Sequence, residues 1–259
     1  MLKEFFTAAL GMLPQQTRLE VIANNMANAN TAGFKRESVF ERNLIDARAN
    51  FYNVKGDVES DDPPIGSYID FENGAFQQTD NPLDLAIDGK GFFVLQDEQG
   101  SEYYTRSGHF RLSTDGTVTA MDGKMLMTDE GPLSIQKDLF KDPEITKDSK
   151  SQSIKIAENG EVFLDNTHIG TVLVANIEDM KSLDRISNQN FIPTEGTDVS
   201  YMPAEEIRMK QGWLEGSNVD IIREMVSMIE LQRVFEAGSK VIHTNDSTLD
   251  SSIKLGRYY

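Results

Sequence analysis

Residues 217–249 read SNVDIIREMVSMIELQRVFEAGSKVIHTNDSTL, a stretch in which mostly apolar residues recur at spacings of three and four. That spacing is typical of an amphipathic α-helix with a stripe that needs a partner. Ser217 followed three residues later by Asp220 matches a capping pattern for a helix start. The stripe comprises Ile221, Met225, Met228, Gln232, Phe235, Ser239, Ile242, Asp246 and Leu249.

A matching stripe occupies residues 1–30, where the spacing again alternates between three and four. Pro14 lies inside it, which predicts a kink or a break near Leu13 because proline removes a helical hydrogen bond. Asn28 to Gly33 supply residues typical of a helix end, and Gly33 suits a left-handed conformation. The stripe comprises Leu2, Phe6, Ala9, Leu13, Gln16, Leu19, Ala23 and Met26.

The two stripes allow two interpretations. Either they pair with each other inside one molecule, or they pack against helices of neighbouring molecules. Both stripes are broad, since Ile22 flanks the first and Ile222 flanks the second. A two-helix hairpin leaves much of such a surface in water, so the breadth favours packing between molecules.

Between the stripes the apolar period changes to two, as in half-buried strands. Asx-Gly pairs such as Asp115-Gly116 and Asp122-Gly123 separate the candidate strands, which indicates an antiparallel sheet or small barrel. Residues 38–49 are a candidate short helix, and the acidic run up to Gly66 is typical of a connector.

The predicted class is therefore α+β, with long N- and C-terminal helices forming a coiled-coil-like assembly layer and an all-β middle domain. The predicted parts are an N-terminal assembly helix at 1–35, a connector at 36–66, a β-rich middle domain at 67–211 and a C-terminal assembly helix at 212–259.

Composition excludes several classes of protein. The chain has 42 acidic against 25 basic residues and a net charge of −17, which opposes binding to nucleic-acid phosphates. No run of residues approaches the roughly 20 apolar positions of a membrane span, so we expect no direct membrane insertion. Residues 1–13 lack the basic start and unbroken apolar run of a cleavable signal peptide. There is no cysteine, which fits either chance in an intracellular protein or export as an unfolded chain.

No catalytic, metal or cofactor site is predicted. His109, His168 and His243 are too scattered to form a metal pair, and their contexts differ. The acidic run from Asp57 to Asp61 lacks the glycine and final glutamate of a calcium loop. Gly89-Lys90-Gly91 lacks the third glycine of a dinucleotide fingerprint. We therefore expect a protein that is not an enzyme.

Three long motifs, in the right order, resemble the bacterial flagellar basal-body rod and hook proteins. The first is VIANNMANANTAGFKR at residues 21–36. The second combines NPLDLAIDGKGFF at 81–93 with YTRSGHF at 104–110, and the third combines GWLEGSNVD at 212–220 with EMVSMI at 224–229. The short connector and the tail at 248–257 resemble the proximal rod member of the family more than the distal one. Ala32, where family members often have proline, departs from the pattern.

The resemblance implies a structural subunit that polymerises helically into the periplasmic drive shaft and transmits torque from motor to hook. Its implied partners are copies of itself and other rod proteins, with hook and ring proteins as further candidates, and the flagellar type III export apparatus. The alternative from another class is a secreted β-rich binding protein or hydrolase.

The predicted assembly residues combine the apolar stripes with four asparagines near the end of the first helix. The asparagines either fix the register between subunits or simply end the helix. The full set is Leu2, Phe6, Leu13, Leu19, Ile22, Asn24, Asn25, Met26, Asn28, Asn30, Ile221, Met225, Met228, Phe235, Ile242 and Leu249.

Overall fold

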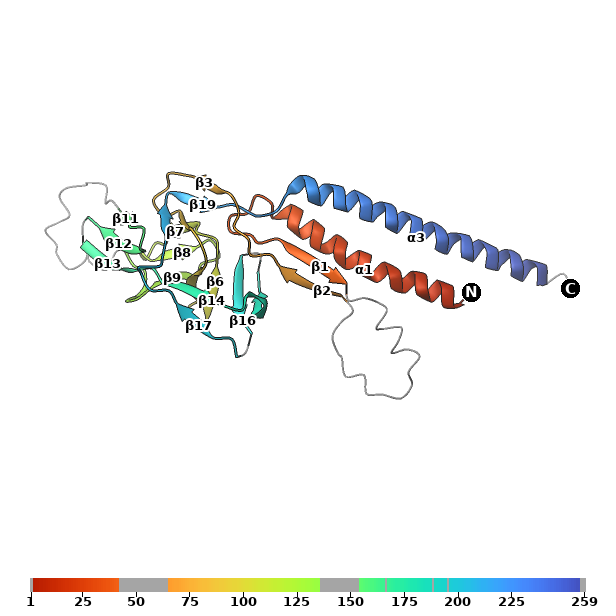
Figure 1. Ribbon diagram of the computed structural model, residues 1–259, viewed down its shortest axis with the longest axis horizontal. Helices are drawn as coiled ribbons and strands as arrows, with labels where there is room; N and C mark the ends of the chain where they lie inside the picture. The colour runs from red at the N-terminus through yellow and green to blue at the C-terminus, as the bar shows by residue number, and fades with distance from the viewer. Residues whose placement is uncertain are drawn as a thin grey trace. The chain divides into compact units, whose positions relative to one another are not determined.

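The computed structural model describes residues 2–41, 65–135 and 154–256, apart from residues 166, 188 and 195. The chain forms two compact units (Figure 1). The helical unit contains residues 1–29, 36–70 and 219–259, and the β unit contains residues 30–35 and 71–218. The chain therefore passes from one unit to the other at 29/30, 35/36, 70/71 and 218/219. The predicted division at residues 35, 66 and 211 stays a prediction.

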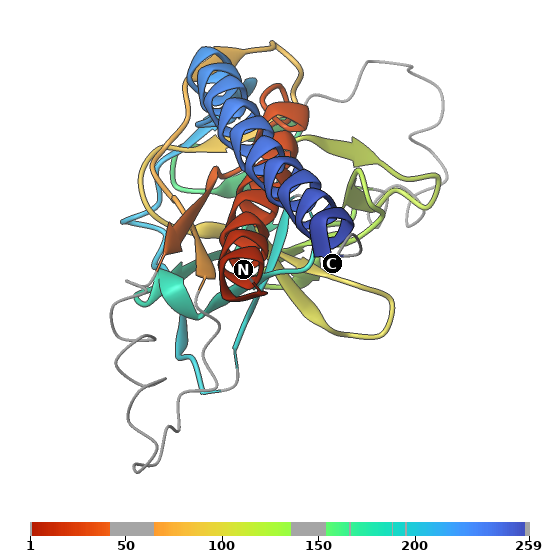
Figure 2. The ribbon, with the colours of Figure 1, turned by 90° about the vertical axis from the view of Figure 1, so that its right-hand side faces the viewer.

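The helical unit holds two α-helices, α1 (Leu2–Ala27) of 26 residues and α3 (Ile221–Gly256) of 36 residues. They lie side by side and run in opposite directions, as Figure 1 and Figure 2 show. Pro14 does not interrupt α1, so the predicted break near Leu13 is wrong. One proline removes a single hydrogen bond from a helix that is long enough to keep its other turns.

The start of α3 also differs from the prediction. The Oδ1 of Asp220 accepts hydrogen bonds from the backbone nitrogens of Ile222 and Arg223, at 3.0 and 3.2 Å. Asp220 is thus the capping residue of a helix that begins at Ile221, and the predicted cap at Ser217 is wrong. A carboxylate at this position satisfies free N–H groups and faces the positive end of the helix.

A two-stranded hairpin completes the helical unit. Strand β1 (Glu37–Glu41) pairs antiparallel with β2 (Ile65–Ile69). The candidate helix at 38–49 is wrong for residues 38–41, which are strand, and its remainder lies outside the described residues. Phe40 pairs with Gly66, where an added Cβ would meet the Phe40 ring at 2.4 Å, so the glycine makes room for the ring.

The β unit is built from short strands. The strands predicted between the terminal stripes are confirmed, with β5 and β12 as two examples. The strands of this unit are β3 (Phe76–Gln78), β4 (Leu85–Ile87), β5 (Phe92–Gln96), β6 (Glu102–Thr105), β7 (Phe110–Leu112), β8 (Val118–Ala120), β9 (Met125–Thr128), β10 (Gly131–Pro132), β11 (Ile154–Ile156), β12 (Glu161–Leu164), β13 (Thr167–Thr171), β14 (Val174–Ile177), β15 (Leu183–Arg185), β16 (Asn190–Pro193), β17 (Val199–Tyr201), β18 (Met209–Gln211) and β19 (Trp213–Glu215).

The pairings between these strands are antiparallel throughout the described residues. The largest sheet has ten strands in the order β15-β16-β6-β5-β9-β8-β7, with β10 on β9 and with β14 joining β5 to β17. A three-stranded sheet β11-β12-β13 and the pairs β18-β4 and β19-β3 complete the unit. At the predicted Asp122-Gly123 turn, Gly123 has φ +90 and the Ala120 nitrogen donates to the Lys124 carbonyl at 2.8 Å, which closes the β8–β9 hairpin.

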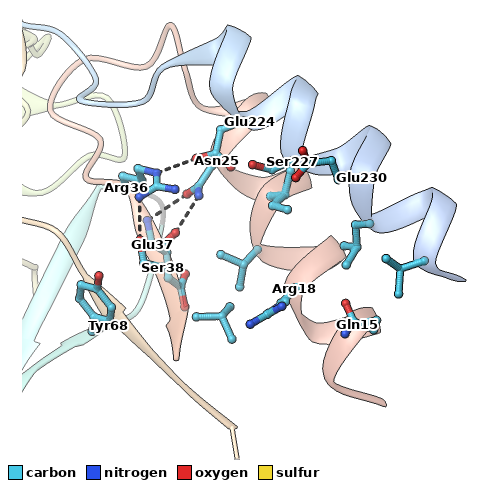
Figure 3. Close-up of a pocket in the computed structure, with 15 residues that line it drawn as sticks. Gln15, Arg18, Asn25, Arg36, Glu37, Ser38, Tyr68, Glu224, Ser227 and Glu230 are labelled. Carbon is cyan, nitrogen blue, oxygen red and sulfur yellow. Dashed lines mark hydrogen bonds and ion pairs between the residues drawn. The ribbon is translucent and has the colours of Figure 1, made fainter. Parts of the chain in front are cut away.

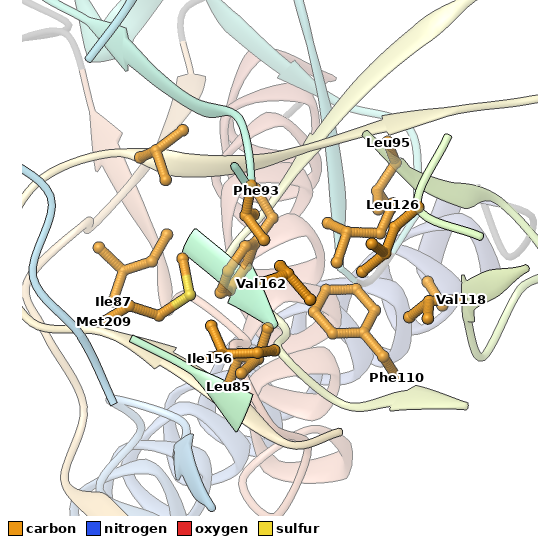
Figure 4. Close-up of a cluster of buried hydrophobic side chains, with 14 of the residues drawn as sticks. Leu85, Ile87, Phe93, Leu95, Phe110, Val118, Leu126, Ile156, Val162 and Met209 are labelled. Carbon is orange, nitrogen blue, oxygen red and sulfur yellow. The ribbon is translucent and has the colours of Figure 1, made fainter. Parts of the chain in front are cut away.

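The core of the β unit joins the ten-stranded sheet to the three-stranded sheet (Figure 4). Phe93 and Phe110 meet edge to face, with ring centroids 5.3 Å apart. Val162 from β12 and Met209 from β18 are at most 2% exposed in the same cluster. Alternation along short strands therefore builds a continuous apolar interior, as the period of two predicted.

The predicted α+β class with a coiled-coil-like layer of terminal helices is wrong. The described residues form mostly β-structure, from β1 to β19, with two α-helices and a β-rich middle. In a coiled coil the apolar stripe is the buried seam, but Met225 and Phe235 are each 48% exposed. Over the described side chains α3 instead buries Glu224 and Leu231, which lie at the edge of that stripe.

Candidate assembly interface

A cavity of about 540 Å³ lies within the helical unit, between α1, α3 and the β1–β2 hairpin (Figure 3). Its walls combine apolar and charged side chains. The charged ones are two guanidiniums, from Arg18 and Arg36, and three carboxylates, from Glu37, Glu224 and Glu230. The apolar ones are Val21, Ile22, Val39, Leu231 and Val234. We call this cavity the acidic pocket, because its carboxylates outnumber its guanidiniums.

An ion pair joins the hairpin to α3 beside the pocket. The Nε of Arg36 lies 2.6 Å from the Oε1 of Glu224, and its Nη1 donates to the Ser38 hydroxyl at 2.8 Å. The Glu224 side chain is 1% exposed and that of Arg36 is 30% exposed. The second carboxylate oxygen of Glu224 is buried and has no hydrogen-bond partner among the described residues. A buried oxygen in that state costs free energy that an incoming donor can recover.

Asn25 joins α1 to the start of the hairpin. Its Nδ2 donates to the Glu37 carbonyl at 2.8 Å, and its Oδ1 accepts from the Glu37 nitrogen at 3.0 Å. Asn25 is 1% exposed, so both of its hydrogen bonds are protected from water. The side-chain amide therefore satisfies the backbone N–H and carbonyl of Glu37 as a neighbouring strand would.

The other predicted asparagines are placed differently. Asn28 is 6% exposed, and its Nδ2 donates to the carbonyl of Asn24 at 2.9 Å, across the last turn of α1. Asn24 and Asn30 are exposed. Asn25 and Asn28 thus bond within their own chain, and a role of the four asparagines in subunit register stays a prediction.

The predicted apolar assembly residues are also spread over different environments. Leu19, Ile22, Met26, Met228 and Ile242 are partly buried. Ile221, Met225 and Phe235 are exposed. Ile22 alone of this set lines the acidic pocket, among the described side chains. The side chains of Leu2, Phe6, Leu13 and Leu249 lie outside the described part of the chain.

The β unit contains a buried ion cluster that the sequence did not indicate. The Nζ of Lys35 lies 2.6 Å from the Oε1 of Glu215 and donates to the Glu72 carbonyl at 2.8 Å. Gly74 donates its backbone N–H to the same Oε1 at 3.1 Å, and the Nη1 of Arg106 lies 3.6 Å from Oε2. Lys35 and Glu215 are at most 1% exposed.

Arg106 is held by more than its charge. It donates to the Ile87 carbonyl and to the Oδ1 of Asn73, both at 3.3 Å, and also to the Gly89 carbonyl. Burial lowers the pKa of its guanidinium below the ordinary value, against the opposing effect of Glu215. These donors offset part of the cost of burying the cluster, and the Oε2 of Glu215 has no hydrogen-bond partner among the described residues.

Residues 30–35 enter the β unit through a close backbone approach at Gly33. Gly33 has φ +70, and an added Cβ would lie 2.3 Å from the Ser107 nitrogen. Its N–H donates to the Glu215 carbonyl at 2.7 Å. The predicted left-handed conformation at Gly33 is confirmed, although α1 has already ended at Ala27.

The histidines take separate places. The Nδ1 of His109 lies 2.8 Å from the Oδ1 of Asp84, and His168 stacks edge on against Phe163. His243 is exposed on α3. The described residues contain no group of three or more histidine, cysteine or acidic side chains arranged to hold a metal ion.

Neither described helix is both long and apolar enough to span a membrane.

Three known protein families match the chain in succession. Residues 6–35 match the family described as flagella basal body rod protein. Residues 86–164 match the flagellar hook protein FlgE/F/G D1 domain, and residues 210–255 match the flagellar basal body rod FlgEFG protein C-terminal family.

Whole-chain relatives carry the same names. The chain is 32% identical over 260 residues to the flagellar basal-body rod protein FlgG of Agrobacterium fabrum, covering 92% of this chain and 94% of the relative. It is 31% identical to FlgG of Bacillus subtilis, over 99% of this chain and 100% of the relative. It is 28% identical to the rod protein FlgF of Caulobacter vibrioides, over 96% and 97%.

The relatives do not specifically favour the proximal member FlgF, towards which the tail and connector pointed, since FlgG relatives match at least as well. The rod itself is common to all of them. Because the matches cover nearly the whole of this chain and of each relative, the chain belongs to the family of flagellar basal-body rod proteins, structural components of the flagellum.

Proposed function

We propose that this protein is a building subunit of the flagellar rod that polymerises helically with copies of itself and with other rod proteins. The polymer is the periplasmic shaft that carries torque from the motor to the hook. Its role is structural and not catalytic. Hook and ring proteins are further partners in this proposal, and the flagellar type III export apparatus is its route out of the cytoplasm.

The observation that carries the proposal is the apolar surface of α3. Large apolar side chains stand exposed along this helix, although the chain as a whole is acidic and polar. Contiguous apolar side chains exposed on a helix are typical of surfaces that other molecules cover. The exposed set comprises Ile221, Ile222, Met225, Val226, Ile229, Val234, Phe235 and Val241.

The predicted assembly residues fit this proposal to different degrees. Met225 and Phe235 are each 48% exposed, so a neighbouring subunit can cover them. Asn24 and Asn30 are exposed and remain available for contacts that set register. The asparagines with internal hydrogen bonds support assembly indirectly, by fixing the end of α1 against the hairpin.

A deletion strain tests the proposal directly. Removing the gene is expected to abolish swimming and to leave basal bodies without a complete rod, and a plasmid copy restores both. Fractionated basal bodies from the complemented strain should contain the protein in many copies, measured by quantitative mass spectrometry. Normal motility and intact rods without this chain would contradict the proposal.

The same strains separate the proximal from the distal position. Immunogold labelling of isolated basal bodies places a tagged chain near the motor side if it is a proximal subunit, and near the hook if it is a distal one. The number of copies per basal body gives a second measure of the position, because the longer of the two rod segments holds more subunits.

A further inference from the structure

The β unit contains a second buried cluster besides the core around Phe93. Phe71, Phe92 and Phe191 meet edge to face, with ring centroids 5.3, 5.6 and 5.9 Å apart. Phe92 and Phe93 are consecutive on β5, and successive side chains of a strand point to opposite faces of its sheet. The three rings therefore form a cluster of their own on the other face of β5, and we call it the ring cluster.

Residues 30–35, which we call the strap, are joined to the ring cluster through Arg185. The strap belongs to the β unit, although residues 1–29 and 36–70 on either side of it belong to the helical unit. Phe34 is fully buried, and the guanidinium of Arg185 lies 4.6 Å from the centroid of its ring and 5.7 Å from that of Phe191. Two cation–π contacts of one arginine thus hold the strap against the ring cluster.

The backbone of the strap is held by distant segments of the chain. The Nε2 of Gln189 donates to the Ala32 carbonyl at 3.2 Å, and the N–H of Gly33 donates to the Glu215 carbonyl at 2.7 Å. A Cβ at Gly33 would lie 2.3 Å from the Ser107 nitrogen, so a glycine is needed for the two backbones to approach this closely. These partners come from residues 107–215, and the strap therefore docks into a slot that later parts of the chain form.

The side chain of Lys35 completes the docking. Its Nζ lies 2.6 Å from the Oε1 of Glu215 and donates to the Glu72 carbonyl at 2.8 Å. Release of the strap returns this ammonium to water, while Arg106 stays 3.6 Å from the other oxygen of Glu215. The core around Phe93 has no member from the strap among the described residues. Opening at the strap therefore exposes less surface, and costs less free energy, than unfolding of the whole β unit.

We propose that the strap and the ring cluster form one cooperative element, which opens by release of residues 30–35 while the core around Phe93 stays folded. Residues 29 and 36, the covalent neighbours of the strap, both belong to the helical unit. A partner that holds residues 29–36 in another conformation competes with the slot for the strap and thereby opens the ring cluster. The β unit thus carries a conformational switch that responds to the state of the N-terminal segment. This switch is a property of the isolated chain and does not depend on the rod proposal.

The variant G33A tests the switch in the full chain, with G100A as its matched control. Gly33 and Gly100 both have a left-handed backbone, with φ +70 and +89, so alanine strains both positions. A Cβ at Gly100 meets nothing within 4 Å, so only G33A also displaces the strap from Ser107. Hydrogen exchange followed by mass spectrometry is expected to rise about tenfold or more in β16 in G33A, and less than about twofold in β12. In G100A both strands should stay within about twofold of the wild type.

Two results for G33A would overturn the proposal. Equal rises in β12 and β16 mean that the core unfolds together with the ring cluster, and no rise in β16 means that the ring cluster does not need the strap. F34L gives a milder test that does not depend on the folding of G33A. It keeps an apolar side chain in the strap but removes the ring beside Arg185, and is expected to raise exchange in β16 about threefold and to leave β12 unchanged. Any other pattern in F34L also overturns the proposal.

An antibody Fab raised against a peptide of residues 29–36 traps the released strap, because Phe34 and Lys35 are fully buried when it is docked. The native full chain is expected to bind this Fab about tenfold or more weakly than the free peptide, since only the released fraction binds. Saturating Fab should raise exchange in β16 and leave β12 unchanged. G33A should bind more tightly than the wild type, and G100A equally. Native binding as tight as that of the free peptide means that the strap is not docked, and binding only to the denatured chain means that it is not released from a folded β unit. Either result overturns the proposal.

Discussion

Two consecutive residues, Lys35 and Arg36, each pair with a glutamate, but the two ion pairs differ in how deeply the cation is buried and in how many charged groups surround the carboxylate. Lys35 and Glu215 are almost inaccessible, and further donors from Gly74 and Arg106 surround the carboxylate. Arg36 is 30% exposed, and Glu224 keeps one oxygen without a hydrogen bond among the described residues. Glu215 likewise keeps one buried oxygen without a hydrogen bond among the described residues, but a second cation, Arg106, lies 3.6 Å from that oxygen.

The difference in burial predicts how much stability each pair contributes. A fully buried pair gives a large penalty when one partner is lost, because the other charge stays buried without compensation. A pair with a partly exposed cation gives a smaller one, because water replaces part of the lost interaction. The following four variants test this contrast.

The largest effect is expected for K35M. It leaves Glu215 charged, buried and short of its nearest partner, so the β unit should lose about 3–5 kcal/mol of stability. Hydrogen exchange of the amides at Gly33, Gly74 and Gly216 measures the loss locally. The double variant K35M/E215L removes both charges and should recover much of it. Equal exchange in K35M and the wild type would show that the cluster is not needed.

N25A should have the next largest effect. It deletes two hydrogen bonds and leaves the backbone N–H and carbonyl of Glu37 without their partner, at a cost of about 2–3 kcal/mol in the helical unit. The control N30A changes an exposed asparagine and should stay within about 0.5 kcal/mol of the wild type. Thermal unfolding followed by circular dichroism at 222 nm gives both values. Similar losses for the two variants would contradict the assignment.

E224Q should cost less, about 1–2 kcal/mol, because its partner Arg36 is partly solvated and the amide keeps an acceptor. Guanidinium denaturation of the monomer measures the loss of stability. A variant that unfolds as easily as K35M would reverse the comparison.

D122N provides the smallest effect, well below 1 kcal/mol after allowance for solvent screening. Burial raises the pKa of Asp122, but hydrogen bonds from Lys124 and Asn190 outweigh it, and the net pKa is lowered. The folded pKa lies below the unfolded one, so this stability is present above the unfolded pKa near 3.9 and is lost as the pH falls through the folded pKa. Melting curves from pH 3 to 7 should therefore differ between D122N and wild type at pH 7, and the difference should shrink as the pH falls.

Local pattern was enough to predict much of the architecture. Alternation and Asx-Gly turns located the strands around Phe93, Phe110 and Val162, because a strand half-buried in a core shows its period in sequence. The period of three and four likewise located α1 and α3. Strands β15 to β19 were missed, because residues 183–215 contain no Asx-Gly pair to mark a turn between them.

Long-range pairing set the limit of prediction. Lys35 stands in the charged run Lys35-Arg36-Glu37, which is typical of a surface, and its partner Glu215 lies 180 residues away. Nothing local to residue 224 marks its carboxylate as buried either. The coiled-coil interpretation failed for a related reason, because periodicity identifies an apolar side of a helix but not which side faces a neighbour.

The four passages of the chain between its units also govern how the molecule can be taken apart. A single peptide-bond cleavage anywhere from residue 30 to residue 218 yields two fragments that each contain pieces of both units. Truncation from either terminus therefore cannot isolate the whole β unit. Cleavage at both 70/71 and 218/219 releases its main segment, residues 71–218, but that segment lacks residues 30–35 of the same unit. Truncated variants made to study one unit will therefore lose residues of that unit or retain residues of the other.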